Sequence, residues 1–386
     1  MRIEENMFQQ TIAKIHLDHI KDNIESIRNA IGKGKKILIP VKANAYGHGA
    51  IVVSKLAEEI GVDWLGVASV PEGVQLRNAN IKLPILKFSP AFPEEMVDAI
   101  KNQLTLTVCD YENINFLERT CEDLQTKVNV HLKIDTGMGR IGVNPEEAVD
   151  YAKYIEEKCP HLVLDGIYTH LPVSDEADVD YTKTQIQQFQ NLVDEVNSTL
   201  GRKINLVHCS NSGGVLAHPE GWMDLVRPGI MVYGYYPSNE TPREISLKPG
   251  LSFITKVSFV KKVSAGTSIG YGRTWIAPRD TFIATIQVGY ADGFNRLLSN
   301  RGRVLINGKS CPVVGRVCMD QTMVDLGPQT DVKVGDDAIL IGKSGEEEIS
   351  CYEWAEKLNT ITYEVTSQIS SRVERVIVPI SSKVGE

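Results

Sequence analysis

The sequence predicts an α/β protein with two domains, a (β/α)8 TIM barrel followed by a mainly antiparallel β domain. Its 386 residues exceed the size at which a single hydrophobic core usually stops growing. Over residues 13–240, short apolar runs alternate with longer amphipathic segments, which is typical of βα units and a parallel sheet. Over residues 241–386 closely spaced β-rich runs follow instead, and we expect the N-terminal segment 1–12 to join this second domain.

The apolar runs of the first part are predicted to be the barrel strands. They are Ile37–Ala43, Trp64–Ser69, Pro84–Phe88, Leu104–Val108, Val128–Asp135, Leu164–His170, Ile204–Ser210 and Met223–Gly229. Helices are predicted between them, and two of these, near residues 92–102 and 144–158, carry Pro-Glu-Glu at the start, a common helix N-terminus. Strands and helices alternating over this length fit a closed barrel, whose usual size is about 250 residues. Strand counting leaves a doubly wound open sheet as the alternative.

The second part, residues 241–386, has a different pattern of apolar and polar residues. Its β-rich runs are residues 252–263, 282–288, 303–317, 322–327 and 338–342, separated by Gly, Asp and Asn turns. One helical run follows, at residues 351–359. A segment rich in proline and polar residues, 235–250, links the two parts. We therefore expect an antiparallel β domain with a small helix.

Composition and charge narrow the class of protein. A net charge of −8, without runs of Lys or Arg, offers no surface for a phosphate backbone, so nucleic acid is not an expected partner. Glu4 and Glu5 stand where a signal peptide needs apolar residues, and no stretch is apolar enough to span a membrane. The seven cysteines lack metal-ligand spacing. We expect a cytoplasmic protein with free thiols, no metal and no membrane partner.

The ends of the predicted barrel strands carry the candidate reactive residues, since (β/α)8 enzymes place their chemistry at the carboxyl ends. Lys42 ends the first strand, and burial is one way to make a lysine amine nucleophilic. The loops after strands seven and eight read NSGG (211–214) and RPGI (227–230), and these loops bind phosphate in many such barrels. A strand-end lysine together with a phosphate loop points to a phosphorylated cofactor that forms an imine, and pyridoxal 5'-phosphate fits.

Several motifs resemble those of the alanine racemases, in the same order and over essentially the whole chain. They are VKANAYGHG (41–49), HLKIDTGMGRIG (131–142), GIYTH (166–170), NSGG, RPGI, IGYGRTW (269–275), VGYADG (288–293), GRVCMDQ (315–321) and TYEV (362–365). Taken singly, residues such as Lys42, His170 and Tyr271 have ordinary structural explanations as a rim lysine, a core histidine and a sheet aromatic. Their joint occurrence in these motifs favours the racemase interpretation.

The resemblance implies a role for each matching residue. Lys42 and Tyr271 would be two catalytic bases, with Lys42 also holding the cofactor. The cofactor contacts it implies, besides Lys42, are Tyr46, His170, Asn211, Ser212, Arg227, Gly229, Ile230 and Tyr363. Arg140 and Met319 would bind the substrate carboxylate, and the supporting residues would be Lys133, Tyr290 and Asp320. Lys133 matches a lysine that is often carbamylated in the family.

The expected function is the interconversion of L- and D-alanine, which would supply D-alanine for bacterial peptidoglycan. A racemase needs two bases on opposite faces of the substrate, and Lys42 and Tyr271 come from different predicted domains. The resemblance also implies a homodimer with shared active sites. Alternatives are a serine or broad-specificity racemase, a decarboxylase, for which an acidic residue is expected in place of Arg227, and a noncatalytic cofactor carrier, which would not need the second domain.

Overall fold

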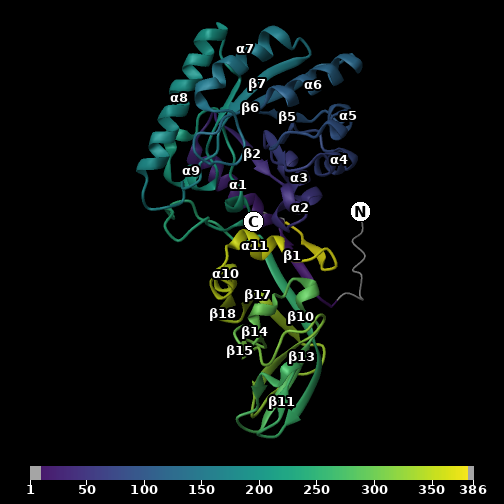
Figure 1. Ribbon diagram of the computed structural model, residues 1–386. Coiled ribbons are helices and arrows are strands. Elements are labelled where there is room, and N and C mark those ends of the chain that lie inside the picture. Colours follow the sequence, from purple (N-terminus) through teal and green to yellow (C-terminus); the bar gives the residue numbers. More distant parts are fainter. Residues whose placement is uncertain (1–9, 381–386) are drawn as a thin grey trace, which may run out of the picture. The chain divides into compact units, whose positions relative to one another are not determined.

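A computed structural model describes residues 10–380 of the chain. It divides into two compact units, His19–Lys248 and the described parts of Met1–Asp18 and Pro249–Glu386 (Figure 1). Residues 13–18 therefore belong with the second unit, whereas the sequence assigned residues 13–240 to the barrel. The reason is that the strand β1 (Ile12–His16) pairs with strands of the second unit. Of the predicted N-terminal segment, residues 1–9 lie outside the described part.

The unit His19–Lys248 contains the predicted barrel. Its parallel strands are β2 (Lys36–Pro40), β3 (Trp64–Val67), β4 (Ile85–Lys87), β5 (Thr105–Val108), β6 (Val128–Lys133), β7 (Leu162–Tyr168), β8 (Leu206–His208) and β9 (Leu225–Val226). They form one sheet in the order β8-β7-β6-β5-β4-β3-β2-β9. Asp224 N–H donates to the Val207 carbonyl (3.1 Å) and Arg227 N–H to the Ser210 carbonyl (2.9 Å), which joins β9 to β8. This closure rules out the open-sheet alternative.

Helices alternate with the barrel strands (Figure 1). They are α1 (Leu17–Ile31), α3 (Ala50–Glu59), α4 (Val70–Asn78), α5 (Pro93–Lys101), α6 (Tyr111–Asp123), α7 (Ala148–Lys158), α8 (Asp180–Leu200) and α9 (Ser212–Ala217). Local sequence starts several of them: Ser69 caps α4 by accepting from Glu72 N–H, and Asp110 caps α6 by accepting from Asn113 N–H. Among residues 10–380, no helix combines the length and apolarity that crossing a bilayer would require.

The interior of the barrel holds an apolar cluster and a set of buried polar residues. The apolar cluster is Leu38, Trp64, Leu86, Leu206 and Leu225, with Phe88 packed against it. Gly66 makes room for this packing, because a Cβ there would lie 2.2 Å from the Phe88 ring. The polar residues that are buried in or just after strands β5 to β9 are Thr107, His131, Lys133, Tyr168, His208 and Arg227. Buried polar groups cost free energy unless they are paired, so this set of polar residues is a candidate site.

The second unit is the expected β domain. Its main sheet has the order β15-β14-β17-β10-β1-β19, with β13, β16 and β18 attached beside it. These strands are β10 (Leu251–Val263), β13 (Thr281–Ile286), β14 (Arg303–Ile306), β15 (Lys309–Pro312), β16 (Thr322–Gly327), β17 (Asp337–Ser344), β18 (Glu347–Ile349) and β19 (Glu374–Val378). The pairs are antiparallel except β1 with β19. A small hairpin, β11 (Ser268–Ile269) and β12 (Trp275–Ile276), and two helices, α10 (Cys351–Leu358) and α11 (Thr362–Ser367), complete it.

Candidate active site

Lys42 begins a turn of left-handed backbone directly after the first barrel strand. β2 ends at Pro40, and Lys42 opens the short segment α2 (Lys42–Tyr46). The residues from Ala43 to Tyr46 have φ between 51° and 54°. The sequence prediction that the strand runs to Ala43 is therefore wrong, because the chain coils at once after Lys42. The coil leaves Lys42 at the carboxyl end of the barrel, where reactive groups of this fold lie.

Glu72 on α4 holds this turn in place. One oxygen of its carboxylate accepts from Ala43 N–H and the other from Ala68 N–H, both at 2.8 Å. Within the turn, the Asn44 side-chain oxygen accepts from Ala50 N–H at 2.8 Å. Left-handed backbone is unfavourable for residues with a Cβ, so such bonds are needed to keep the turn formed. Sequence reasoning missed Glu72, although its helix-capping partner Ser69 stands three residues before it.

Lys42 lies in an environment that favours its neutral amine. Partial burial, and next the charge of Arg140, lower the pKa of Lys42 below its ordinary value, whereas Glu72 acts in the opposite direction. A neutral amine is the form that attacks a carbonyl carbon and accepts a proton. The position is therefore chemically suited to imine formation.

Arg227 is a buried cation held by neutral acceptors. Its guanidinium donates to His208 Nδ1 (2.6 Å) and to the carbonyl oxygens of Thr169 (2.8 Å) and Cys209 (2.9 Å), and it lies 3.4 Å from His170 Nδ1. Burial lowers its pKa to about 10, so it stays charged at neutral pH. No ion pair recorded for residues 10–380 includes Arg227. The group can donate hydrogen bonds but accept none.

Several positive charges converge on one histidine. Burial, followed by the charges of Arg227, Arg140, Lys133 and Lys42, holds the pKa of His170 well below its ordinary value. Lys133 Nζ donates to the Ile134 carbonyl at 2.6 Å, and burial together with the charge of Arg227 lowers its pKa to about 7. An anionic ligand would neutralise this excess of positive charge. The permanently charged guanidiniums of Arg227 and Arg140 therefore suit the carboxyl end of the barrel to an anionic group such as a phosphate or carboxylate.

Four of the predicted cofactor contacts, Tyr46, Ser212, Gly229 and Ile230, lie together in the barrel. Ser212 Oγ accepts from Gly229 N–H at 2.9 Å, and Ile230 follows directly at the start of a buried turn. A Cβ on Gly229 would lie 3.0 Å from the Tyr46 hydroxyl, so glycine allows this close approach. Asn211 caps α9, where its side chain accepts from Gly214 N–H and Ser174 Oγ and donates to the Leu171 carbonyl. Asn211 thus positions the loop through its side chain.

Four of the five candidate residues of the second unit, Tyr271, Tyr290, Met319 and Asp320, lie in or beside the loop 315–321. Tyr271 stands at the tip of the β11–β12 hairpin with 72% of its surface exposed, and Met319 is 53% exposed. Tyr290 N–H donates to the Cys318 carbonyl at 3.0 Å, and Asp320 accepts from Arg372 at 2.7 Å. Tyr363 lies on α11 and is half-buried. The candidate residues therefore fall into two groups, one in the barrel unit and one in the second unit.

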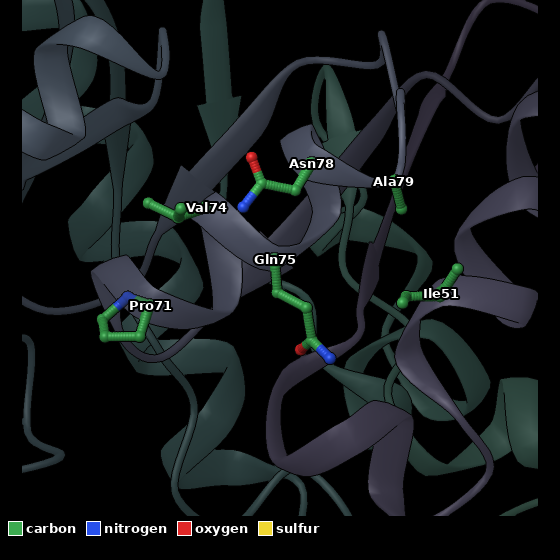
Figure 2. A pocket seen from close by; sticks show the side chains of 6 residues that line it. All are labelled: Ile51, Pro71, Val74, Gln75, Asn78 and Ala79. Atoms are coloured by element: carbon green, nitrogen blue, oxygen red, sulfur yellow. The ribbon is translucent and has the colours of Figure 1, made fainter.

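A separate pocket of about 450 Å³ lies on the helices, between α3 and α4 (Figure 2). It is lined by Ile51, Pro71, Val74, Gln75, Asn78 and Ala79. Its polar side-chain atoms belong to the amides of Gln75 and Asn78, and its lining offers no acid, base or nucleophile. The reactive residues lie elsewhere, at the carboxyl ends of the strands.

Comparison with protein families gives two matches that together span most of the chain. The model of the alanine racemase N-terminal domain matches residues 15–237, and that of the alanine racemase C-terminal domain matches residues 251–377. The alanine racemase of Cutibacterium acnes is 45% identical over 371 residues, which is 94% of this chain and 96% of that protein. That of Desulforamulus reducens is 42% identical over 369 residues, or 95% of this chain and 98% of that protein.

Solved structures agree with these matches. The alanine racemase of Clostridium difficile 630 has a TM-score of 0.90 at 38% identity, covering 96% of each chain. The alanine racemase of Bacillus anthracis with bound L-Ala-P also has a TM-score of 0.90, at 37% identity and 96% coverage of each chain. The fold of both units is thus shared with these racemases.

Proposed function

This chain belongs to the alanine racemase family and is an amino-acid racemase, and on that premise we propose that it interconverts L- and D-alanine with pyridoxal 5'-phosphate. Lys42 and Tyr271 serve as the two bases of this proposal. Its biological role is the supply of D-alanine for peptidoglycan in the bacterial cytoplasm. The observation that carries the proposal is that the cations Arg227 and Arg140 both act on His170 at this end of the barrel, since two permanent positive charges call for an anionic ligand.

The residues present fit the cofactor. Its phosphate matches the hydroxyls of Tyr46 and Ser212 and the backbone of Gly229 and Ile230, which lie together in the barrel, with Tyr363 as a further ligand. Lys42 supplies the amine for its carbonyl carbon. When bound, the cofactor delocalises the electron pair that remains when the α-proton of the amino acid is removed.

Lys42 and Tyr271 exchange a proton with the two opposite faces of the substrate. For either direction of reaction, one takes the α-proton and the other returns one. Lys42 is suited to this task because its environment favours the neutral amine. His170 bonds the Tyr271 hydroxyl in this proposal and is itself 3.4 Å from Arg227. Arg227 can only donate to the ring nitrogen, which limits electron withdrawal and favours racemisation over decarboxylation.

Arg140 and the backbone of Met319 bind the substrate carboxylate in this proposal. Arg140 is exposed in its own unit, and Met319 is 53% exposed, so both are free to meet a ligand. Lys133 becomes a carbamate that orients Arg140, and its pKa of about 7 supports this, because an unprotonated amine reacts with carbon dioxide. Tyr290 and Asp320 line the passage by which substrate reaches the site.

The proposed assembly is a homodimer with shared active sites. Tyr271 is 72% exposed on its unit, and a partner barrel would cover it. A two-fold pair would exclude water from both sites at once. This arrangement supplies Lys42 and Tyr271 of each site from different chains.

A chiral assay of the purified protein tests the function. When the protein is incubated with the L and D forms of each common amino acid, it should racemise alanine fastest. The rate with serine separates an alanine enzyme from a broad-specificity one. The protein should show the near-visible absorbance of its cofactor, and Lys42→Ala should remove it. If Lys42→Ala loses racemisation but keeps the cofactor absorbance, the assignment of Lys42 as the cofactor lysine is refuted. If the parent protein does not racemise any amino acid, the proposed function is refuted.

A further inference from the structure

We propose that His131 and Asp165 are positioning residues that hold Arg227 through His208, by a directional chain of side chains across the barrel. The effect on catalysis rests on the proposed function, in which Arg227 faces the cofactor ring. The series of side-chain contacts itself lies within the unit His19–Lys248. It links strands β6, β7 and β8 to the residue that follows β9.

The contacts form a continuous line. Arg227 Nη1 and His208 Nδ1 are 2.6 Å apart, and His208 Nε2 and His131 Nδ1 are 2.9 Å apart. His131 Nε2 then faces the Asp165 carboxylate at 3.9 Å. His131 and His208 are fully buried, so no bulk water competes for these atoms. The second oxygen of Asp165 accepts from Asn205 at 2.7 Å, which keeps the carboxylate oriented.

The chemistry of the groups sets the direction of every bond. Arg227 has no acceptor, so His208 must present a bare Nδ1 and carry its proton on Nε2. That proton is donated to His131 Nδ1, which leaves the His131 proton on Nε2, toward Asp165. Burial lowers the pKa of both histidines, so both are neutral and each has one defined tautomer. At 3.9 Å the Asp165 charge is beyond a direct hydrogen bond but still favours the N–H that points to it.

A bulge in the sheet places Asp165 for this role. Between β6 and β7, Val130 pairs with Leu164 while the next residue, His131, pairs with Gly166. Asp165 is therefore the extra residue of β7. A bulge redirects side chains and is rare between parallel strands. Gly166 completes the arrangement, because a Cβ there would lie 2.6 Å from the His131 ring.

Without His131, the direction of the hydrogen bonds from Arg227 through His208 is no longer fixed. His208 would hold a buried N–H with no acceptor, or it would move its proton to Nδ1 and face Arg227 with a second donor. Both outcomes are unfavourable, and the second forces the planar guanidinium of Arg227 to rotate. The proposed substrate-binding residues, Arg140 and Met319, are not part of this series of hydrogen bonds. A change at His131 should therefore lower kcat more than it alters KM.

Two measurements test the proposal on the cofactor-loaded protein. In ¹⁵N-histidine NMR of the parent protein, two histidines should have a protonated Nε2 and a bare Nδ1 and should not titrate while the protein stays folded. Any other state of His131 or His208, assigned by the loss of signals in the variants, overturns the proposal. This result does not depend on racemase activity, so it is separable from failure of the proposed function.

The kinetic test compares matched variants. His131→Leu should lower kcat about tenfold or more with KM within about twofold, and tenfold corresponds to about 1.4 kcal/mol in the barrier. His131→Asn places a side-chain oxygen near the lost Nδ1 and should recover most of that loss. Asp165→Asn should give a smaller loss in kcat, and His161→Leu, on the pair of His161 with Glu118, is the control. An unchanged kcat in His131→Leu, or no recovery in His131→Asn, would overturn the proposal.

Discussion

Replacing Glu72 by alanine should loosen the turn that carries Lys42 without unfolding the barrel. The change removes the acceptors for the N–H groups of Ala43 and Ala68, both bonded at 2.8 Å, and for the longer bond from Ser69 N–H at 3.3 Å. The Asn44 bond to Ala50 and the backbone bonds of the turn remain. Lys42 should then sample more positions, since it precedes the left-handed residues directly.

The magnitude follows from the strain and the bonds. Left-handed helical backbone costs about 1 kcal/mol per residue, so the turn 43–46 stores about 4 kcal/mol. Hydrogen bonds to a carboxylate contribute about 1.5–3 kcal/mol each, and partial exposure of Glu72 reduces this to about 1 kcal/mol each. Glu72→Ala should therefore lower the free energy of unfolding by about 2 kcal/mol.

Denaturant unfolding and steady-state kinetics measure the two effects. The control is Glu59→Ala, because Glu59 is an exposed residue of the neighbouring helix α3 and such changes usually stay within about 0.5 kcal/mol. Glu72→Gln keeps one of the two acceptor oxygens, so its free energy of unfolding should lie between those of Glu72→Ala and Glu59→Ala. We expect a loss of about tenfold in kcat/KM for Glu72→Ala, equal to about 1.4 kcal/mol. Stability and kinetics equal to those of Glu59→Ala would refute the reasoning.

Four further predictions concern the bases, the loop and the assembly. Tyr271→Phe should retain the cofactor absorbance but slow the exchange of the α-hydrogen of L-alanine with solvent; exchange at the parent rate would contradict its role as the base on that face. A Cβ on Gly289 would lie 2.2 Å from the Met319 carbonyl oxygen, so Gly289→Ala should displace that loop and raise KM for alanine, and an unchanged KM would argue against substrate binding by Met319. The pKa of Lys133 is lowered from 10.5 to about 7, so between these pH values only the unfolded chain binds the proton. In carbon-dioxide-free buffer the free energy of unfolding should therefore rise with pH over this range. A denaturation series in which Lys133→Met shows the same rise would exclude this cause. Mixing Lys42→Ala with Tyr271→Phe should restore about a quarter of the parent activity if subunits pair at random and share sites, and no recovery after verified subunit exchange would exclude shared sites.

The strand pattern of the barrel could be predicted from the sequence because it is local. Apolar runs such as Trp64–Ser69 and Leu104–Val108 are long enough for one strand and are bounded by turn or helix signals. The structure has strands at each predicted run, and the family comparisons agree with the fold class. The motif VKANAYGHG likewise marked Lys42 directly, since its signal lies in consecutive residues.

The end of the first strand could not be predicted in this way. The run Ile37–Ala43 is continuously apolar up to Lys42 and suggests a strand to its end. The chain instead turns left-handed after Lys42, and this turn depends on Glu72, which lies on another helix. A contact with a residue far along the sequence leaves no trace in the local pattern.

The polar chain from Asp165 to Arg227 shows the same limit. Each member lies in a strand or at a strand end that was predicted, and nothing in the sequence of each strand distinguishes His131 or His208 from an ordinary buried histidine. What joins them is that β6, β7, β8 and β9 are consecutive around a closed barrel, and that a bulge turns Asp165 toward His131. The sequence by itself predicted which residues carry chemistry and determined the order of the elements. Only the closed barrel decided which of those residues meet, because neighbours across a sheet are set by strand order and register rather than by distance along the chain.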